Sequence, residues 1–320
     1  MKILFAWTGV TSYMASCWRA LQALEGVSFS AVVENVESGS AFDAEKIFSS
    51  LDVTVVEKGA LAPEMEKPDI LFAVGWRSPM VRALVEREDW ADVPKVCCFD
   101  MPFRKSLRCF VARFALRKYL RLFDAAYVPG VVAERYAKWL RFKKIERGLF
   151  SIDIGKFSAG RENKERKGFL YAGRFSPEKR VDDIKEAYEI YRSNGGKWEI
   201  VFCGQGGRLV SPDEMPSLYS QSGCLILASS FDPWPLVALE SSAAGCSVIM
   251  SDKCGNRYEL SSSRVFKCGD VRALAKLMLE AENAPRFEEN NIGQYDCAEW
   301  ASRTLRIANE LVFHADGSGR

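Results

Sequence analysis

The sequence predicts an α/β protein with two doubly wound domains, in which parallel strands alternate with helices. Short apolar segments alternate with helical patterns along the chain, they fall into two series, and the polar stretch Ser158–Lys167 separates the series. At 320 residues the chain is long for one compact domain and long enough for two. We therefore place a first domain at residues 1–157, a second at 158–293 and a last segment at 294–313.

Six strands are expected in the first series and five in the second. The first six are Ile3–Trp7, Ser30–Val33, Thr54–Val56, Ile70–Val74, Val96–Phe99 and Ala125–Val128. The other five are Gly168–Ala172, Trp198–Cys203, Leu225–Ala228, Ser247–Met250 and the weaker Val265–Phe266. Helices are expected at Val181–Ser193, Pro235–Ala244 and, last, Trp300–Phe313. Because ligands of such sheets bind at the carboxyl ends of the strands, the residues after each strand are the first candidates for a site.

Composition excludes several classes of protein. A hydrophobic content of 48% is enough for buried cores, so the chain is not a disordered one. No apolar run approaches the roughly 18–20 residues of a membrane span, and Met1–Trp7 is too short for a secretory signal. The ten cysteines show no Cys-x-x-Cys spacing, so we expect reduced, buried thiols in a cytoplasmic protein. The single histidine, His314, lies in the polar tail, which argues against a histidine triad or a His-rich metal site.

Two short segments of the second half carry residues that suggest a chemistry. Gly173–Lys179 follows an apolar segment and places two positive charges, Arg174 and Lys179, five residues apart. Asp232–Glu240 places two carboxylates eight residues apart, across the start of a helical pattern that ends at Gly245. Cations that hold a diphosphate, facing carboxylates that hold sugar hydroxyls, are the chemistry of glycosyl transfer from a nucleotide sugar.

No metal clamp accompanies these residues. A departing nucleoside diphosphate gains negative charge, and the protein must balance it with cations when no metal ion does so. The sequence contains no Asp-x-Asp, which other glycosyltransferases use to hold a metal. We therefore expect no metal site and no cofactor other than the nucleotide sugar itself as donor substrate.

Each candidate residue also has a structural explanation. Taken alone, Arg174 and Lys179 are explained as solvated loop residues, and Asp232 as a helix N-cap followed by a proline. Glu240 lies among apolar neighbours in its helix, where an unpaired carboxylate is costly, so we expect it to have a partner. The glycine-rich turn that begins at Gly204 either brings backbone N–H groups close to a nucleotide or is a tight turn.

The second half resembles the donor domain of family 4 retaining glycosyltransferases. The resemblance rests on Gly173–Lys179, the Asp232–Glu240 pair, Ala243–Gly245 and the pattern Ser251-Asp252…Gly255…Glu259-Leu260, in order and spacing. It implies the GT-B fold, with an acceptor domain first, a donor domain second, the two domains facing each other, and a last helix that crosses back to the first domain.

The resemblance also implies roles for the donor-side residues. Arg174 and Lys179 would bind the donor diphosphate, and Leu236 would offer its backbone N–H near the phosphates. Glu240 would bind the ribose hydroxyls, and Asp232 would contact the transferred sugar.

Two residues depart from the family pattern at the sugar end of this site. Asp232 stands where the family usually has Glu, which shortens the side chain by one methylene. Pro235 stands where Gly is usual, which removes one backbone donor.

The first half resembles the family less closely. Gly9 follows the first strand, as a glycine loop near the reaction centre does in relatives, so we expect Gly9 near the donor. The family often has a His after a later strand of this domain. Here the segment is Cys98–Pro102, in which Asp100 is the titratable candidate, and a cap or turn role explains Asp100 equally well.

Positive charge is concentrated in residues 101–150, which hold thirteen lysines and arginines and three acidic residues. Residues 104–121 carry two apolar stripes on opposite helical faces, so a single helix is either covered on two sides or breaks near Ala115. Arg113, Arg117 and Arg121 project between the stripes. An acceptor that carries phosphate, an anionic membrane face with a lipid-linked acceptor, and ordinary solvated charge all explain them. Nucleic acid is disfavoured, because no reading motif accompanies the charge.

These features together predict an enzyme, a retaining glycosyltransferase that moves a sugar from a UDP- or GDP-linked donor to a glycan or lipid-linked acceptor. We expect it in the cytoplasm or at the inner face of a membrane. The alternative is a catalytically weak or inactive nucleotide-sugar-binding protein in a glycan assembly complex. A GT-B epimerase or phosphorylase is a further alternative, for which the chain offers few acid–base groups and no recognisable pyridoxal lysine.

Overall fold

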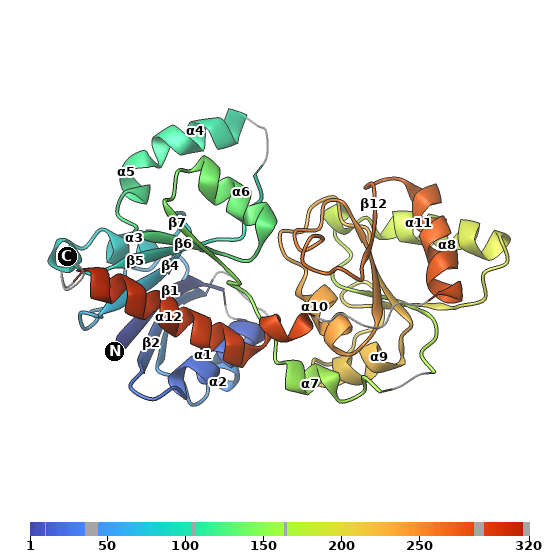
Figure 1. The fold of residues 1–320 in the computed structure, drawn as a ribbon, viewed down its shortest axis with the longest axis horizontal. Helices are drawn as coiled ribbons and strands as arrows, with labels where there is room; N and C mark the ends of the chain where they lie inside the picture. Colours follow the sequence, from blue (N-terminus) through green and yellow to red (C-terminus); the bar gives the residue numbers. More distant parts are fainter. Residues whose placement is uncertain (10, 36–43, 104–106, 163–164, 285–290, 316–320) are drawn as a thin grey trace. The chain divides into compact units, whose positions relative to one another are not determined.

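The computed structural model describes residues 1–9, 11–35, 44–103, 107–162, 165–284 and 291–315. The chain divides into two compact units. The first comprises Met1–Ser151 and Cys297–Arg320, and the second comprises Ile152–Asp296. Each unit is a parallel sheet connected by helices (Figure 1).

The first unit is built on a seven-stranded sheet of spatial order β3-β2-β1-β4-β5-β6-β7, in which every adjacent pair of strands is parallel. The order reverses between β1 and β4, which makes that point the topological switch of the sheet. Its strands are β1 (Lys2–Thr8), β2 (Ser28–Asn35), β3 (Val53–Glu57), β4 (Ile70–Val74), β5 (Lys95–Cys98), β6 (Ala125–Val128) and β7 (Lys144–Arg147).

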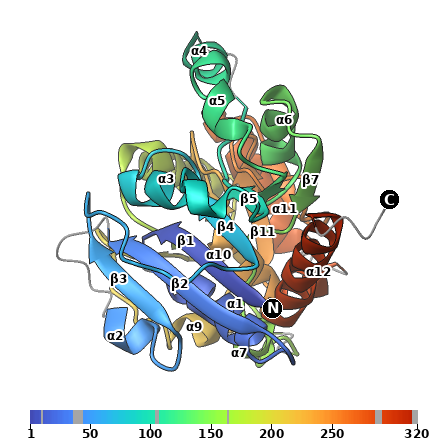
Figure 2. The ribbon, with the colours of Figure 1, turned by 90° about the vertical axis from the view of Figure 1, so that its left-hand side faces the viewer.

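Helices connect these strands, and Figure 2 shows α1 and α3 on opposite sides of the sheet. The helices of this unit are α1 (Ser12–Gln22), α2 (Ala44–Ile47), α3 (Pro79–Val85), α4 (Leu107–Ala115), α5 (Arg117–Leu120), α6 (Val131–Trp139) and α12 (Cys297–Ala315), with a 3₁₀ turn at Glu88–Trp90.

The last helix, α12, belongs to the first unit, as the resemblance implied. It packs beside α1, and Trp300 anchors it in the core. The Trp300 indole is fully buried, its ring centroid lies 6.0 Å from that of Phe5, and its N–H donates to the Leu149 carbonyl over 2.7 Å. Aromatic burial and one satisfied indole donor therefore tie the end of the chain to its beginning.

The second unit is built on a five-stranded parallel sheet of order β12-β11-β10-β8-β9. Its strands are β8 (Phe169–Ala172), β9 (Ile200–Cys203), β10 (Cys224–Leu227), β11 (Ser247–Ser251) and β12 (Arg264–Phe266). Its helices are α7 (Ile154–Ser158), α8 (Val181–Ser193), α9 (Met215–Gln221), α10 (Leu236–Ala243) and α11 (Val271–Asn283), with 3₁₀ turns at Pro177–Lys179 and Ile292–Tyr295.

Every expected strand is present, and the structure adds β7, which the sequence did not suggest. Its four residues, Lys-Ile-Glu-Arg, include one apolar side chain. β7 is an edge strand of the first sheet, and edge strands commonly carry charges that oppose pairing with other chains. The apolar signal that marks a buried strand is therefore missing.

The boundary between the units lies before the expected hinge at Ser158–Lys167. The chain crosses at Ser151–Ile152 and returns at Asp296–Cys297. The Ile152 N–H donates to the Tyr295 carbonyl over 2.9 Å, so the two segments that connect the units are hydrogen-bonded to each other. The expected hinge lies inside the second unit because Arg166, a residue of that polar stretch, is buried there and donates to the Ala244 carbonyl.

Candidate functional site

The candidate donor residues lie at the topological switch point of the second sheet. The chain passes from β8 to β9 on one side of β8 and then to β10 on the other, so the order reverses between the neighbouring strands β8 and β10. Arg174 and Lys179 follow β8, and Asp232 follows β10. In open α/β sheets, ligands bind outside the carboxyl ends of the strands at such a point.

Lys179 and Asp232 form a direct ion pair, with 2.5 Å between Nζ and Oδ2. Both side chains are largely buried, Lys179 to 20% exposure and Asp232 to 11%. Burial raises the pKa of the Asp232 carboxyl, and the neighbouring Lys179 ammonium, the Trp234 N–H and the Arg174 charge oppose that rise. The cation and the carboxylate that the sequence placed in separate motifs therefore contact each other.

Arg174 is the second cation of this cluster and is exposed. Among the described residues its guanidinium makes no ion pair, although its charge reaches Asp232 and Glu178. The Tyr171 hydroxyl donates to the Arg174 carbonyl over 2.6 Å and so holds the backbone of the turn after β8. Arg174 thus presents a positive charge from a fixed turn to solvent.

The loops after β8, β10 and β11 are tied together through their backbones. Ser230 donates through its N–H and its hydroxyl to the Glu178 carbonyl, over 2.7 and 3.1 Å. The Gly255 N–H donates to the Asp232 carbonyl over 2.8 Å. A side chain at Gly255 would collide with the Pro233 carbonyl oxygen, so only glycine allows this approach. The position of Asp232 is therefore determined by three loops at once.

Asp232 is not a helix cap, which corrects one of the two sequence interpretations. Helix α10 begins at Leu236, and Pro235 is its N-cap. Helical backbone is disfavoured for a residue that precedes proline, which accounts for a helix that starts after the second proline and not at Trp234. With the capping role excluded, Lys179 is the side-chain partner of Asp232 in the structure.

Leu236 is the first residue of α10, a position whose N–H has no acceptor within the helix. Pro235 before it has no N–H at all. The helix start therefore leaves the N–H groups of Leu236 and Val237 for a ligand, because the Ala238 N–H donates to the Pro235 carbonyl over 3.1 Å. The role of Leu236 towards the donor phosphates stays a prediction.

Glu240 has the partner that its burial demanded. The hydroxyl of Tyr219, in α9, donates to Glu240 Oε2 over 2.8 Å. Burial raises the pKa of the Glu240 carboxyl, and the Tyr219 hydrogen bond opposes the rise. Tyr219 itself is fully buried, and no spacing in the sequence singled it out. A carboxylate accepts about four hydrogen bonds, so Glu240 retains capacity for a ligand hydroxyl.

Gly204 is required by close packing of two loops. Its φ is +115°, and a side chain there would collide with the Gly173 carbonyl oxygen. Its N–H donates to the Arg208 carbonyl over 2.9 Å, which closes a tight turn. Of the two interpretations of this glycine, the structure supports the turn, because the N–H is already used within the protein.

Gly9 and Asp100 belong to the first unit, each after a strand of its sheet. Gly9 has a φ of +87°, which favours glycine, and its N–H donates to the Glu34 carbonyl over 2.9 Å. Burial raises the pKa of the Tyr13 hydroxyl, and the charge of Asp100 adds to the rise. The roles of Gly9 and Asp100 towards a donor stay predictions.

Over the described ranges, no cluster of three or more His, Cys, Asp and Glu side chains is arranged to hold a metal ion.

Part of the second unit matches a known protein family. Residues 207–296 match the family described as glycosyl transferases group 1, and the match includes Asp232 and Glu240. No match was found among curated protein sequences.

Solved structures resemble the whole chain at low sequence identity. The N-terminal domain of trehalose-6-phosphate phosphatase from Candida albicans is 13% identical, with a TM-score of 0.74 over 97% of this chain and 96% of that one. Sucrose-phosphate synthase from Thermosynechococcus elongatus is 12% identical, with a TM-score of 0.72 over 97% and 99%. HepE from Anabaena, solved in complex with UDP and glucose, is 13% identical, with a TM-score of 0.64 over 99% and 98%.

These likenesses define the class of the fold. The chain has the GT-B fold, composed of two Rossmann-like units. The family match over residues 207–296, part of the second unit, supports a glycosyltransferase.

Proposed function

We propose that this protein transfers a sugar from a nucleotide-sugar donor to a glycan or lipid-linked acceptor, with retention of anomeric configuration and without a metal ion. The observation that carries the proposal is the pairing of Lys179 with Asp232 at the switch point of the second sheet, beside the exposed cation Arg174. The family match over residues 207–296 supports the same class of reaction.

In this reaction the bond between the anomeric carbon and the diphosphate oxygen breaks, and the electron pair stays on the diphosphate. The acceptor hydroxyl forms the new bond to the anomeric carbon, and its proton passes to the leaving diphosphate. Arg174 and Lys179 would stabilise the charge that develops on the leaving diphosphate. The N–H groups of Leu236 and Val237, at the start of α10, would add to that stabilisation.

The carboxylates would recognise hydroxyl groups of the donor. Glu240 accepts one hydrogen bond from Tyr219 and would accept others from the ribose. Asp232 would contact the transferred sugar while it also holds the Lys179 ammonium in place. UDP is the first nucleotide to test, because the structurally similar Anabaena protein was solved with UDP and glucose; GDP is the second.

The first experiment identifies the nucleotide. Thermal unfolding is followed with UDP, GDP, ADP and CMP at millimolar concentration, where a ligand present at 100 times its Kd stabilises by about 2.7 kcal/mol. Lys179→Ala and Arg174→Ala should each reduce the shift given by the active nucleotide. Lys185→Ala, which removes an exposed cation of α8, is the matched control and should leave it unchanged.

Transfer itself is then measured with the nucleotide sugar so identified. Lys179→Ala is expected to lower turnover about 10²–10³-fold, the effect of removing one donor to the developing charge. Wild-type turnover by Lys179→Ala at saturating acceptor contradicts the proposal.

A second candidate function is a binding protein that holds a nucleotide sugar without transferring it. The observation that favours it is Pro235 at the N-cap of α10, which has no N–H to offer to a phosphate beside the shortened Asp232 side chain. Tight donor binding by calorimetry, with no turnover across a panel of acceptors, would establish this function in place of the first.

A further inference from the structure

A cavity of about 800 Å³ lies in the first unit at the end of the sheet opposite to the candidate ligand edge. Its lining includes Phe123 and Asp124, which directly precede β6, and Lys143, which directly precedes β7. These are the amino ends of the strands, whereas ligands of such sheets bind at the carboxyl ends. The cavity is therefore separate from the residues that follow the strands, Gly9 and Asp100 among them.

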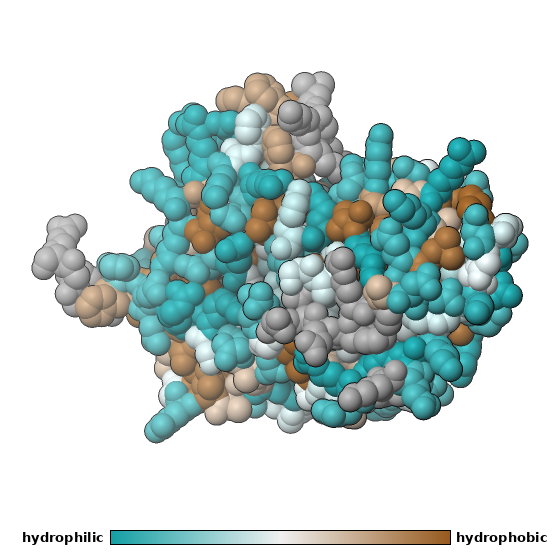
Figure 3. Space-filling model, turned by 45° about the vertical axis from the view of Figure 1, so that its right-hand side comes forward, coloured by the Kyte–Doolittle hydropathy of each residue, from teal (hydrophilic) through white to brown (hydrophobic). Residues whose placement is uncertain are grey.

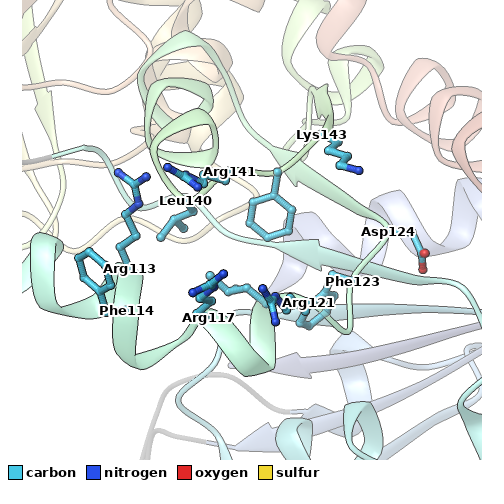
Figure 4. Close-up of a pocket in the computed structure, with 11 residues that line it drawn as sticks. Arg113, Phe114, Arg117, Arg121, Phe123, Asp124, Leu140, Arg141 and Lys143 are labelled. Atoms are coloured by element: carbon cyan, nitrogen blue, oxygen red, sulfur yellow. The ribbon is translucent and has the colours of Figure 1, made fainter.

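The lining is strongly basic. It contains five cations and one acidic residue; the cations are Arg113, Arg117, Arg121, Arg141 and Lys143. Figure 4 shows Arg117 and Arg121 on one side of the space and Arg141 on the other, with Asp124 far from Arg113.

Among the residues that the structure describes, no carboxylate forms an ion pair with these positive charges. The one acidic group, Asp124, already accepts a hydrogen bond from the Lys95 N–H over 2.8 Å. In the part of the chain that the structure describes, none of the five cations forms an ion pair, and Arg113 instead lies 4.7 Å above the Trp139 ring. Helices α4 and α5 add no acidic residue, because residues 107–123 contain no Asp or Glu.

Helix α4 carries exposed apolar side chains next to this cavity. The exposed fractions are 51% for Phe110, 53% for Val111 and 60% for Phe114, and the rings of Phe110 and Phe114 are 5.1 Å apart. Figures 1 and 2 show α4 lying beyond α5, away from the sheet, and Figure 3 shows a hydrophobic area at the top, where Figure 1 places α4.

Of the two apolar stripes of this region, one is buried and the other stays exposed. The helix breaks at Leu116, between α4 and α5. Of the two arrangements expected from the sequence, cover on both sides or a break near Ala115, the structure has the break. The break allows Tyr119, Leu120 and Phe123 to enter the core, where each is 8% exposed or less. The stripe on α4 stays at the surface, since α4 has its principal helix contact with α5.

We propose that α4, α5 and the basic cavity form a docking surface for a bilayer that contains anionic phospholipid. Phe110, Val111 and Phe114 would enter the boundary between headgroups and acyl chains, and the cavity cations would bind headgroup phosphates. Aromatic and aliphatic side chains beside clustered arginines are the features of segments that lie in a membrane interface. A nucleic acid would use the charge, but it would leave the aliphatic part of the α4 face in water.

No membrane-spanning segment accompanies this surface: no helix among the described residues is both long enough and apolar enough to cross a bilayer. The proposal concerns attachment at a surface, and it does not depend on which sugar, if any, the second unit transfers.

The test is sedimentation of the full chain with vesicles of phosphatidylcholine, with and without about a third of phosphatidylglycerol. The wild type should bind the anionic vesicles alone, and binding should weaken as salt screens the charges. Arg117→Gln/Arg121→Gln should weaken binding about fivefold for each cation removed. Lys46→Gln/Lys58→Gln, which removes two exposed cations of the same unit outside the cavity, is the matched control and should bind like wild type.

The apolar part is tested separately. The salt concentration is raised until the arginine variant and the wild type bind anionic vesicles equally well, so that the charges no longer contribute. Phe110→Ser/Phe114→Ser should still weaken vesicle binding under this condition. Leu61→Ser removes another apolar side chain of this unit, 81% exposed, and should have no effect. Circular dichroism and thermal unfolding confirm that each variant is folded.

Several outcomes overturn the proposal. They are equal binding to both kinds of vesicle, no binding to either, and binding of anionic vesicles by the arginine variant at control strength. Binding of inorganic diphosphate through the same arginines without vesicle binding assigns the cavity to a soluble phosphate ligand. Binding of DNA without vesicle binding assigns it to nucleic acid. None of these results bears on nucleotide binding, which is measured without vesicles.

Discussion

At the scale of single residues, the Lys179–Asp232 pair determines the character of the candidate site. Both side chains are largely removed from water, and burial raises the pKa of the Asp232 carboxyl while Lys179 opposes the rise. A desolvated pair contributes little net stability, but removal of one partner leaves the other charge uncompensated. The pair is thus better suited to hold two groups ready for a ligand than to stabilise the fold.

The first prediction concerns this pair. Lys179→Met should destabilise the second unit by up to about 3 kcal/mol, because it leaves a buried carboxylate without its cation. Addition of Asp232→Asn should recover most of that loss. Urea unfolding of the wild type, the two single variants and the double variant measures the coupling, and additive effects of the two substitutions contradict the prediction.

The second prediction concerns Glu240 and pH. Burial raises the pKa of Glu240 above its ordinary value of 4.5 in the folded state. Below that ordinary value the carboxyl is protonated in both states, and its burial costs nothing extra. As the pH rises from the ordinary value through the raised pKa, the unfolded state loses its proton first. The free energy of unfolding then falls by about 1.4 kcal/mol for each pH unit that separates the two pKa values.

Glu240→Gln removes this dependence and keeps an oxygen for the Tyr219 hydroxyl. The variant should therefore gain stability relative to wild type between about pH 4 and about pH 7. Urea unfolding at both pH values measures the difference. Glu186→Gln changes an exposed carboxyl of α8 and should show no such gain. A stability difference for Glu240→Gln that is the same at both pH values argues against a raised pKa.

At the scale of elements, the loops that follow the strands of the second sheet pack backbone against backbone. Gly204 lies against the Gly173 carbonyl and has a φ of +115°. Gly195 also has a positive φ, +88°, but has open space where a side chain would be. A substitution at Gly195 therefore costs only the strain of a positive φ, whereas a substitution at Gly204 also costs a steric collision.

The third prediction uses this contrast. Gly195→Ala should cost about 1–2 kcal/mol, the strain of a left-handed backbone. Gly204→Ala should cost about 1–3 kcal/mol more, because the added methyl group must displace the turn after β8. It should also weaken nucleotide binding, since that turn carries Arg174. Equal destabilisation by the two substitutions would contradict the prediction, because it would mean that the Gly204 turn can move away from the Gly173 carbonyl without loss of stability.

Elements could be predicted from the sequence where apolar periodicity marks them. Helix α8 spans Val181–Ser193, as its pattern indicated, and β4 and β6 have their expected bounds. Strand β7 could not be predicted, because a half-buried edge strand does not need apolar residues. The division between the units lies before residues 158–167, whose charge suggested solvent, because Arg166 is buried and donates to the carbonyl of Ala244, far away in the sequence.

At the scale of the whole molecule, each unit has its own core, and the last helix completes the core of the first unit. Trp300 is fully buried and donates to the Leu149 carbonyl. The end of the chain is therefore a structural part of the unit with which the chain begins.

The fourth prediction follows from this arrangement. Trp300→Ala should cost about 3–5 kcal/mol, the usual loss for a buried tryptophan. In hydrogen exchange, the backbone amides of β1, β4 and α1 should lose protection, and those of β8–β12 should stay as protected as in the wild type. Faster exchange throughout both sheets would mean that the two cores unfold as one.

Local patterns in the sequence were enough to predict the fold class, the two series of strands and the candidate residues of the donor site, because periodicity and motif spacing are properties of short stretches of chain. They also indicated that Glu240 needed a partner and that the basic helical stretch would either be covered on two sides or break near Ala115, and the structure has the break. The folded chain was needed to show that Lys179 pairs with Asp232, that Tyr219 donates to Glu240 and that a basic cavity lies beside exposed phenylalanines. These contacts join residues from different strands and helices, and which of them meet depends on the strand order and backbone turns of the folded sheets.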